Sequence, residues 1–329
     1  MKKTKLAPIA LFVYSRPDHL KRTVEALAAN TLAAESELII FSDGPKNDDV
    51  ISRVEQVRLF IDKIKGFASI RTIKREKNMG LANSIITGVT QVINEYGKII
   101  VLEDDLVTSK FFLDYMNDGL DLYENNREVS SINGFMHPLK VSSTPIPESY
   151  FLPHSDCLGW GTWKRVWDNF NSDACVLLKE LKKRKLVDKF DFDSSYPYTR
   201  LLKQQIKGKV DSWAIRWYAT NFLLDLKGLY PGKSLVQHIG FDSYGTHCGE
   251  FNNSDELFNS SLAESYNKIQ KVAVKIDPVL YGYLRDYYKR IFSRRNAVIE
   301  FIFDIVRTIL PKPILRFTRK IRVKRHHRS

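Results

Sequence analysis

The stretch that most constrains this 329-residue chain is an apolar run that ends in three acidic residues. Residues 99–102 read Ile-Ile-Val-Leu, which is typical of a buried strand. Glu103, Asp104 and Asp105 follow at once. Like charges this close repel, so a compensating charge is expected, and Mg²⁺ or Mn²⁺ suits carboxylates while keeping places for substrate phosphates. The alternative is a solvated acidic turn between a strand and a helix.

Hydrophobic periodicity predicts strands alternating with helices over the first hundred residues. This alternation predicts an α/β fold with a mostly parallel sheet flanked by helices. Ligands of such sheets bind at the carboxyl ends of strands, which is where the acidic triplet lies. The expected strands are 6–14, 37–42, 68–73 and 98–103, and the expected helices start at Pro17, at 48 and near Leu81.

The second half of the chain is less regular. We expect a helix at 109–124, a strand at 129–135, and loops with short strands from 136 to 160. Residues 159–163, Gly-Trp-Gly-Thr-Trp, are expected to form a turn into a short helix, because glycines favour turns. Residues 176–207 and 210–226 are expected to be mostly helical, and 231–248 to be rich in loops.

The net charge of +13 is concentrated at the C-terminal end. Residues 285–329 contain 14 Lys or Arg and 3 Asp or Glu, whereas the first 284 residues contain 37 and 35. A cationic helical extension with interleaved apolar residues suits an anionic membrane surface, so we expect a peripheral position on the inner face of the cell membrane. A nucleic-acid-binding tail is the alternative. The nearly neutral body shows no recognition motif, so no nucleic-acid partner is expected.

Cysteine usage and hydropathy indicate a cytoplasmic protein. Cys157, Cys175 and Cys248 form no Cys-x-x-Cys motif and are read as free thiols of a reducing compartment. No run approaches the ~18 uncharged apolar residues of a membrane span.

Several short motifs recur here in one order. Together they resemble the nucleotide-sugar glycosyltransferases of the GT-A fold, and Glu-Asp-Asp-Leu followed by Phe111-Phe112 resembles N-acetylglucosaminyltransferase I and its bacterial relatives. The resemblance covers roughly residues 6–250. The motifs are Ser15-Arg16, Ser42-Asp43-Gly44, Asn78-x-Gly80-Leu81-Ala82, Val101 to Leu106, Gly159-Trp160-Gly161 and Val210-Asp211-Ser212-Trp213.

The resemblance implies a nucleotide-sugar donor, usually a UDP-sugar, bound with Mn²⁺ or Mg²⁺. It implies that Asp105 holds the metal directly and that Glu103 and Asp104 lie near the ribose and the donor sugar. It places Arg16, next to Ser15, beside the nucleotide. It also assigns Asp43 to the base. From the residues alone, Arg16 could instead pair with a surface acid, and Asp43-Gly44-Pro45 could be only a turn.

The same resemblance adds Asn78, Gly80 and Trp160 to the donor site. Asn78 and Gly80 could equally be a loop and a helix start. Trp160 could offer its ring to a sugar face or could belong to the core.

The proposed base and the second metal ligand come later in the chain. The resemblance implies that Asp211, before a tryptophan-containing helix, takes a proton from the acceptor, whereas a helix cap is the alternative. It allows a late histidine as a metal ligand, for which His238 is the first candidate and His247 the second. Each histidine could instead be a hydrogen-bonded loop residue.

These interpretations predict a metal-dependent, inverting hexosyl- or N-acetylhexosaminyltransferase. Its acceptor would be a saccharide, free or lipid-linked, in bacterial surface polysaccharide synthesis. A nucleotidyltransferase is the rival enzyme, but it would need a glycine-rich, lysine-containing loop where Ser15-Arg16-Pro17-Asp18 stands.

The predicted organisation has three parts. Residues 1–135 form the nucleotide-sugar half, 136–250 the acceptor and catalytic half, and 251–329 a helical basic extension. A chain that ends near Tyr281 is therefore expected to stay soluble and to bind donor.

Overall fold

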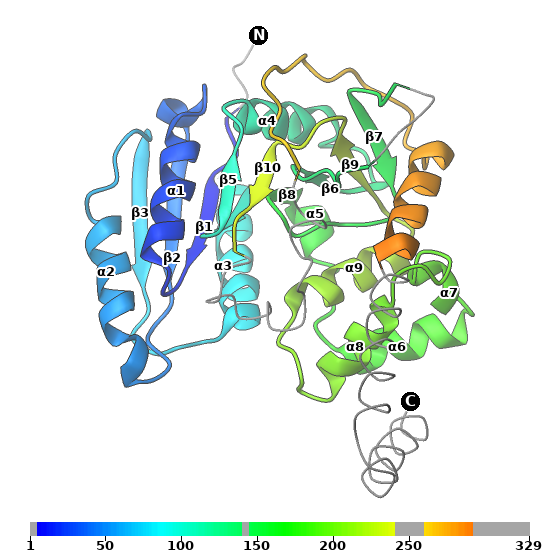
Figure 1. Cartoon of the computed structure of the whole chain (residues 1–329), viewed down its shortest axis with the longest axis horizontal. Helices are drawn as coiled ribbons and strands as arrows, with labels where there is room; N and C mark the ends of the chain where they lie inside the picture. The colour runs from blue at the N-terminus through cyan, green and yellow to red at the C-terminus, as the bar shows by residue number, and fades with distance from the viewer. Residues whose placement is uncertain (1–4, 140–144, 241–259, 292–329) are drawn as a thin grey trace, which may run out of the picture.

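The computed structural model describes residues 5–139, 145–240 and 260–291, and the account that follows concerns these residues. The predicted α/β fold is confirmed. An eight-stranded sheet in the order β3-β2-β1-β4-β8-β6-β9-β7 is flanked by helices (Figure 1).

The first half of the sheet is parallel. Its three inner strands, β1, β2 and β4, are buried on both faces, which explains their continuous apolar runs, whereas the edge strand β3 is only partly buried. The chain crosses from β1 outward to β3 and then back to β4, so right-handed crossovers place α1 and α2 on one face and α3 on the other. The strands are β1 (Ile9–Val13), β2 (Glu37–Ser42), β3 (Ser69–Lys74) and β4 (Lys98–Glu103), and the helices are α1 (Pro17–Ala28), α2 (Ile51–Ile61) and α3 (Leu81–Tyr96).

The second half of the sheet is mixed. β8 (Trp160–Trp163) runs antiparallel to both β4 and β6 (Val129–Asn133). β9 (Lys227–Pro231) is parallel to β6, and β7 (Ser149–Leu152) closes the edge. A two-stranded sheet pairs β5 (Leu106–Thr108) with β10 (Val236–His238). α4 (Phe112–Leu122) packs against β6 and β8.

The prediction of a turn at residues 159–163 is wrong, because Trp160–Trp163 is an interior strand. Pairing on both edges overrides the local turn preference of the glycines. A Cβ on Gly161 would lie 2.9 Å from the carbonyl oxygen of Ile99, so the glycine serves a close backbone approach.

A second hydrophobic core lies beneath the helices of the C-terminal half. The helical residues 278–291, orange in Figure 1, contribute Leu280, Leu284, Tyr287 and Tyr288 to this core. A chain that ends near Tyr281 would lose three of these four side chains, because folded structure extends beyond that point, at least to residue 291. The other helices are α5 (Lys164–Trp167), α6 (Ala174–Lys183), α7 (Val187–Phe190), α8 (Tyr198–Ile206) and α9 (Trp213–Leu223).

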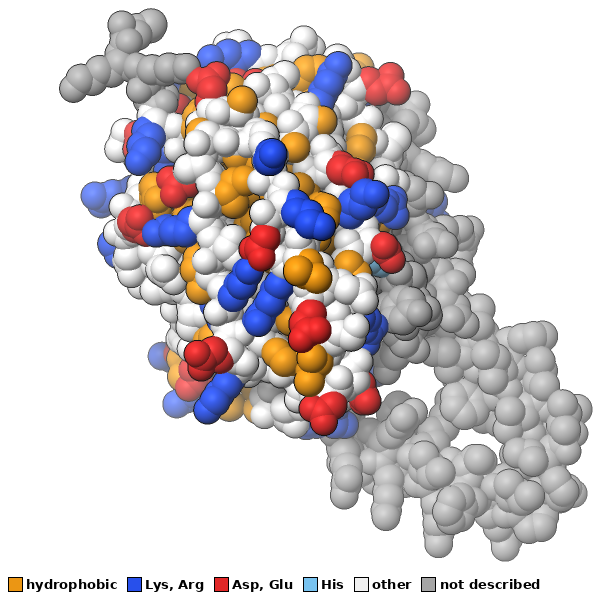
Figure 2. Space-filling model, turned by 90° about the vertical axis from the view of Figure 1, so that its left-hand side faces the viewer, with side chains coloured by type: hydrophobic (Ala, Val, Ile, Leu, Met, Phe, Trp, Pro, Cys, Tyr) orange, Lys and Arg blue, Asp and Glu red, His pale blue; other side chains and the backbone are white. Residues whose placement is uncertain are grey.

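Charge on the described body is mixed. Figure 2 shows acidic and basic side chains interspersed with apolar ones on the face next to α2 and β3. In the part of the chain that the structure describes, no helix is both long and apolar enough to cross a membrane. The basic residues after 291 lie outside the described residues.

Candidate active site

The acidic triplet lies where the sheet changes from parallel to antiparallel pairing. Glu103 is the last residue of β4, and Asp104 and Asp105 form the tight turn into β5. β4 has β1 on one side and β8 on the other, so the carboxyl ends of β1 and β4 lie together. Such a point in an open α/β sheet is where ligands bind. A cavity of about 760 Å³ opens there, which lies within the usual range of small-molecule sites.

Arg16, just after β1, supplies part of the charge that the acidic triplet requires. Its Nη2 atom lies 2.9 Å from Asp104 Oδ1 and 2.9 Å from Asp105 Oδ2. Burial alone would lower the pKa of Arg16, but the two carboxylates raise it above its ordinary value. The alternative of a surface ion pair does not fit, because Asp104 and Asp105 are both buried.

His238 is the second partner of Asp105 and contacts the same oxygen as Arg16. The pairing of β10 with β5 brings its Nε2 atom to 3.3 Å from Asp105 Oδ2. Burial would raise the pKa of Asp105, but the hydrogen bond and charge of His238, together with Arg16, lower it to about 2. Asp105 is therefore held as a carboxylate. His247 lies outside the described residues.

The raised pKa values of the other two acids of the triplet show that the site has too little positive charge. Burial, and then the charges of Asp105 and Asp104, raise the pKa of Glu103 to about 8. Burial also raises the pKa of Asp104 to about 6, although Arg16 opposes it. Three acidic side chains thus face one permanent positive charge, that of Arg16, so the site would gain from a further cation.

Two donor atoms of the site could share a cation whose remaining positions are filled by a ligand and water. Among the described residues, no group of three or more His, Cys, Asp or Glu side chains is arranged to hold a metal ion. The 3.3 Å between Asp105 Oδ2 and His238 Nε2 is short enough for both atoms to bind one cation. Mg²⁺ commonly takes one or two protein carboxylates and fills its remaining positions with water and phosphate oxygens.

Asp43, at the end of β2, organises the loop before α3. Its Oδ1 accepts the N–H of Met79 at 3.0 Å, and its Oδ2 accepts the N–H of Gly80 and the side-chain amide of Asn78, each at 3.2 Å. Gly80 has a φ of +76°, which a residue with a Cβ adopts only with strain. Asp43, Asn78 and Gly80 therefore form one unit, in which Asp43 does more than complete a turn.

Asp211, just before α9, lines the cavity and contacts the first turn of α3. Its Oδ2 accepts the N–H of Ala82 at 3.2 Å, and its Oδ1 lies 3.9 Å from Arg216 Nη2. The cap of α9 is Ser212, whose hydroxyl accepts the N–H of Ile215. Asp211 is therefore not the cap of its own helix, and with 54% of its side chain exposed it remains open to a ligand.

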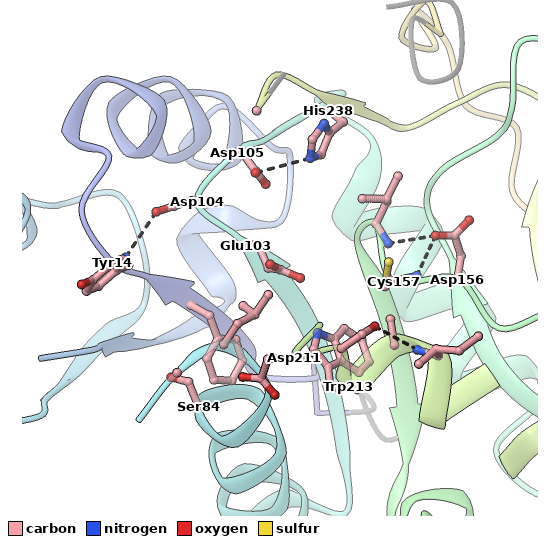
Figure 3. A pocket seen from close by; sticks show the side chains of 18 of the residues that line it. Tyr14, Ser84, Glu103, Asp104, Asp105, Asp156, Cys157, Asp211, Trp213 and His238 are labelled. Atoms are coloured by element: carbon pink, nitrogen blue, oxygen red, sulfur yellow. Dashed lines mark hydrogen bonds and ion pairs between the residues drawn. The ribbon is translucent and has the colours of Figure 1, made fainter. Parts of the chain in front are cut away.

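The structure brings nearly all the predicted site residues together. Figure 3 shows Glu103, Asp105 and His238 facing the space above Asp211 and Trp213. Those that line the cavity are Ser15, Arg16, Asp43, Asn78, Gly80, Glu103, Asp104, Asp105, Asp211 and His238.

Trp160 is the exception, and its prediction as a donor contact is wrong. Its ring has no exposed surface, and it packs on Trp213 and Trp217 with ring centroids 5.2 Å apart in each case. A ring enclosed by other indoles cannot also stack on a sugar. The core alternative therefore holds.

One wall of the cavity was not predicted from the sequence. His137, His154, Tyr196, Tyr198 and Tyr288 line it. These residues come from separate parts of the chain and share no motif, so no local signal marks them.

Comparisons with known proteins give only distant likenesses. No protein-family model matches the chain, and no curated protein matches it. The chain is similar to the mannosyltransferase PcManGT from Pyrobaculum calidifontis in complex with GDP-Man and Mn²⁺, with 9% identity and a TM-score of 0.28 over 40% of this chain and 36% of that chain.

Two structures of S. aureus TarS 1-349 are also similar. One has 12% identity and a TM-score of 0.40 over 71% of this chain and 60% of that chain. The other, in complex with UDP-GlcNAc, has 11% identity and a TM-score of 0.35 over 70% and 57%. The chain thus spans less than two thirds of each of these structures. At these identities and TM-scores, the likeness identifies neither a reaction nor a substrate for this chain.

Proposed function

We propose that the chain is a glycosyltransferase that moves a hexosyl or N-acetylhexosaminyl group from a nucleotide sugar, of the UDP class, to a saccharide acceptor. One observation carries this proposal: residues from six distant segments converge on one cavity, with an acidic centre at the end of β4 and Asp211 on the same lining. The loop after β1 holds Arg16 against that centre, where a nucleotidyltransferase would need its glycine-rich phosphate loop.

In the proposed reaction, an acceptor hydroxyl oxygen forms a bond to the anomeric carbon of the donor. The bond from that carbon to the diphosphate oxygen breaks, and its electron pair leaves with the nucleoside diphosphate. The hydroxyl proton passes to the carboxylate of Asp211. A base on the face opposite the diphosphate corresponds to inversion at the anomeric carbon.

The leaving diphosphate would lie beside the acidic centre, with cations between the two sets of negative charges. Asp105 and His238 would hold Mn²⁺ or Mg²⁺, which when bound would neutralise charge on the leaving group as a Lewis acid. Arg16 contributes a fixed positive charge at the same place. The unit formed by Asp43, Asn78 and Gly80 lies on the N-terminal side of the cavity and would contact the nucleoside.

The position in the cell is proposed from the sequence. The 14 basic residues of 285–329 suit an anionic bilayer surface, where each Lys or Arg near the surface contributes about 1 kcal/mol. We propose that the enzyme binds the inner face of the cell membrane and acts there on a lipid-linked saccharide.

A panel of nucleotides tests the proposed class. Thermal unfolding would be followed with UDP, GDP, UDP-sugars and UTP, each with and without Mn²⁺. A nucleoside diphosphate at 100 times its Kd should add about 2.7 kcal/mol to the free energy of unfolding. Slow hydrolysis of a nucleotide sugar should accompany binding. The proposal would be refuted if no nucleoside diphosphate or nucleotide sugar binds. It would also be refuted if the protein transfers UMP from UTP to a sugar phosphate with release of pyrophosphate.

A further inference from the structure

The far end of the cavity has a different chemistry from the acidic centre. Its wall combines His137, His154, Tyr196, Tyr198 and Tyr288. Tyr198 is the first residue of α8, and Tyr196 lies two residues before it. Tyr288 comes from helical residues 278–291, which follow the sheet in the chain. This wall is therefore assembled by packing in the second hydrophobic core.

The polar atoms of this wall form a continuous chain. His154 Nδ1 lies 2.8 Å from the hydroxyl oxygen of Tyr230, and its Nε2 lies 3.2 Å from that of Tyr198. The Tyr198 hydroxyl lies 3.3 Å from that of Tyr288, which lies 3.1 Å from His137 Nε2. Such linked networks hold their members in place and orient their hydrogen-bonding groups.

The side chains of His154, Tyr198 and Tyr288 in this network are neutral at pH 7. Burial, and then His137, lower the pKa of His154 to about 3. Burial raises the pKa of Tyr198 and of Tyr288 well above the ordinary value. In the described lining of the cavity, the Lys and Arg residues are Arg16, Lys46 and Arg53, which belong to the N-terminal strands and helices. Among the described residues, the wall formed by His137, His154, Tyr196, Tyr198 and Tyr288 therefore contains no Lys or Arg to pair with an anion.

The wall also presents aromatic rings. The ring of Tyr196 is partly exposed and lies against Tyr198 and Tyr288, with centroid distances of 4.3 and 4.9 Å. Aromatic rings beside neutral hydroxyl and imidazole groups suit a ligand with both an apolar face and uncharged hydroxyls. A pyranose ring has this combination: axial C–H bonds on one face and hydroxyl groups around its edge.

We propose that His137, His154, Tyr196, Tyr198 and Tyr288 form the subsite for a neutral hexopyranose ring of the acceptor. The inference rests on the proposed function, since it places the acceptor at the end of the cavity away from the N-terminal, nucleoside side. It also makes residues 278–291 part of the active site, because they supply Tyr288.

The test measures two affinities on one protein. The probes are UDP with Mn²⁺, and methyl glycosides of glucose, galactose, mannose and N-acetylglucosamine added to the UDP-loaded protein, followed by saturation-transfer NMR. At least one glycoside should bind. Tyr196→Ala should weaken it about 3- to 10-fold, as expected for the loss of one ring contact, and leave the Kd of UDP within twofold.

A second variant and a control separate the contribution of the aromatic ring to glycoside binding from that of the hydroxyl group. Tyr198→Phe keeps the ring but removes the hydroxyl that joins His154 to Tyr288, and should also weaken the glycoside. Tyr96→Phe is the matched control, because its hydroxyl donates to Glu37 at 2.7 Å and does not line the cavity. The control should leave both affinities unchanged.

The outcomes distinguish this inference from the proposed function. If UDP binds but no glycoside does, the subsite alone is overturned. The same holds if the affinity for the glycoside is unchanged in the Tyr196→Ala and Tyr198→Phe variants. Equal weakening of UDP and glycoside in a folded Tyr196→Ala variant would assign the wall to the donor and also overturn it. Glycoside binding that depends on Tyr196 without any nucleotide binding would retain a saccharide site and refute the transferase.

Discussion

The carboxylate of Asp211 accepts a hydrogen bond from the backbone N–H of Ala82, with Oδ2 3.2 Å from the nitrogen. Ala82 lies in the first turn of α3, where N–H groups have no partner within the helix. Asp211 supplies that partner from 129 residues away, just before α9. The same side chain thus stabilises the junction of α3 and α9 and faces the cavity.

Two substitutions at Asp211 should separate these contributions. Asp211→Asn keeps an oxygen for the N–H of Ala82 but removes the base, so turnover should fall by about 10² to 10⁴ with little change in stability. Asp211→Ala should lose turnover and also about 1 kcal/mol of stability, the usual value of a helix cap. Sugar transfer and urea unfolding would be measured on both variants. Near-normal turnover in Asp211→Asn would leave the side chain with a structural role only.

Asp105→Asn should abolish the effect of Mn²⁺ on nucleotide binding. Even side chains that only orient a metal ligand are worth 10- to 100-fold in metal affinity, so loss of a ligand should cost at least about tenfold. Titration calorimetry of UDP with and without Mn²⁺ measures the effect. Asp62→Asn, which breaks an exposed pair with Lys74, is the control. If Mn²⁺ still tightens UDP binding to Asp105→Asn, Asp105 does not hold the metal.

Stability should depend on pH through His154. Its pKa is about 3 in the folded chain, against an ordinary value of 6.5. Between these values the unfolded chain binds a proton that the folded chain does not. This group therefore lowers the free energy of unfolding by about 1.4 kcal/mol for each pH unit below 6.5, and has no such effect above it.

Comparison with His154→Gln isolates that contribution. Urea unfolding of both proteins at pH 7.0, 6.0 and 5.5 should show a smaller loss in the variant, by about 1 kcal/mol at the lowest pH. Equal losses in the two proteins would mean that His154 binds a proton in the folded chain as well.

The truncation point should decide whether the C-terminal half folds. A chain that ends at residue 291 keeps Leu284, Tyr287 and Tyr288, whose exposed fractions are 1%, 5% and 1%. A chain that ends at residue 281 loses all three, and removal of one buried large side chain already costs about 2–5 kcal/mol. Circular dichroism during heating should show a native-like transition for the longer chain and a much lower or absent one for the shorter.

The same longer truncation tests the membrane proposal. The full-length chain should sediment with vesicles that contain anionic lipid and should be released by high salt, because electrostatic attraction is screened. The chain that ends at residue 291 should stay in the supernatant and still bind UDP. Equal sedimentation of the two proteins would show that the basic tail does not bind the membrane.

Local pattern predicted the first half of the fold closely. The predicted strand 37–42 is β2 residue for residue, and the predicted start near Leu81 is the first residue of α3. A parallel sheet buried on both faces leaves continuous apolar runs, which can be read directly from the chain. Trp160–Trp163 could not be read in this way, because its strand exists only through pairing with β4 and β6.

The sequence by itself determined the four parallel strands of the first half of the sheet and, through the order of the motifs, the residues of the acidic centre. These features are local, since each motif directly follows a strand or precedes a helix. Only the tertiary structure decided that Trp160 is enclosed, that Asp211 meets Ala82, and that Tyr288 joins Tyr198 and His137. The contacts of Asp211 and Tyr288 join residues 90 to 151 positions apart. Those of Tyr288 arise because the helices of the C-terminal half bury a common core. Periodicity reports which face of an element is buried, whereas the partner that it meets is set by the packing of the whole chain.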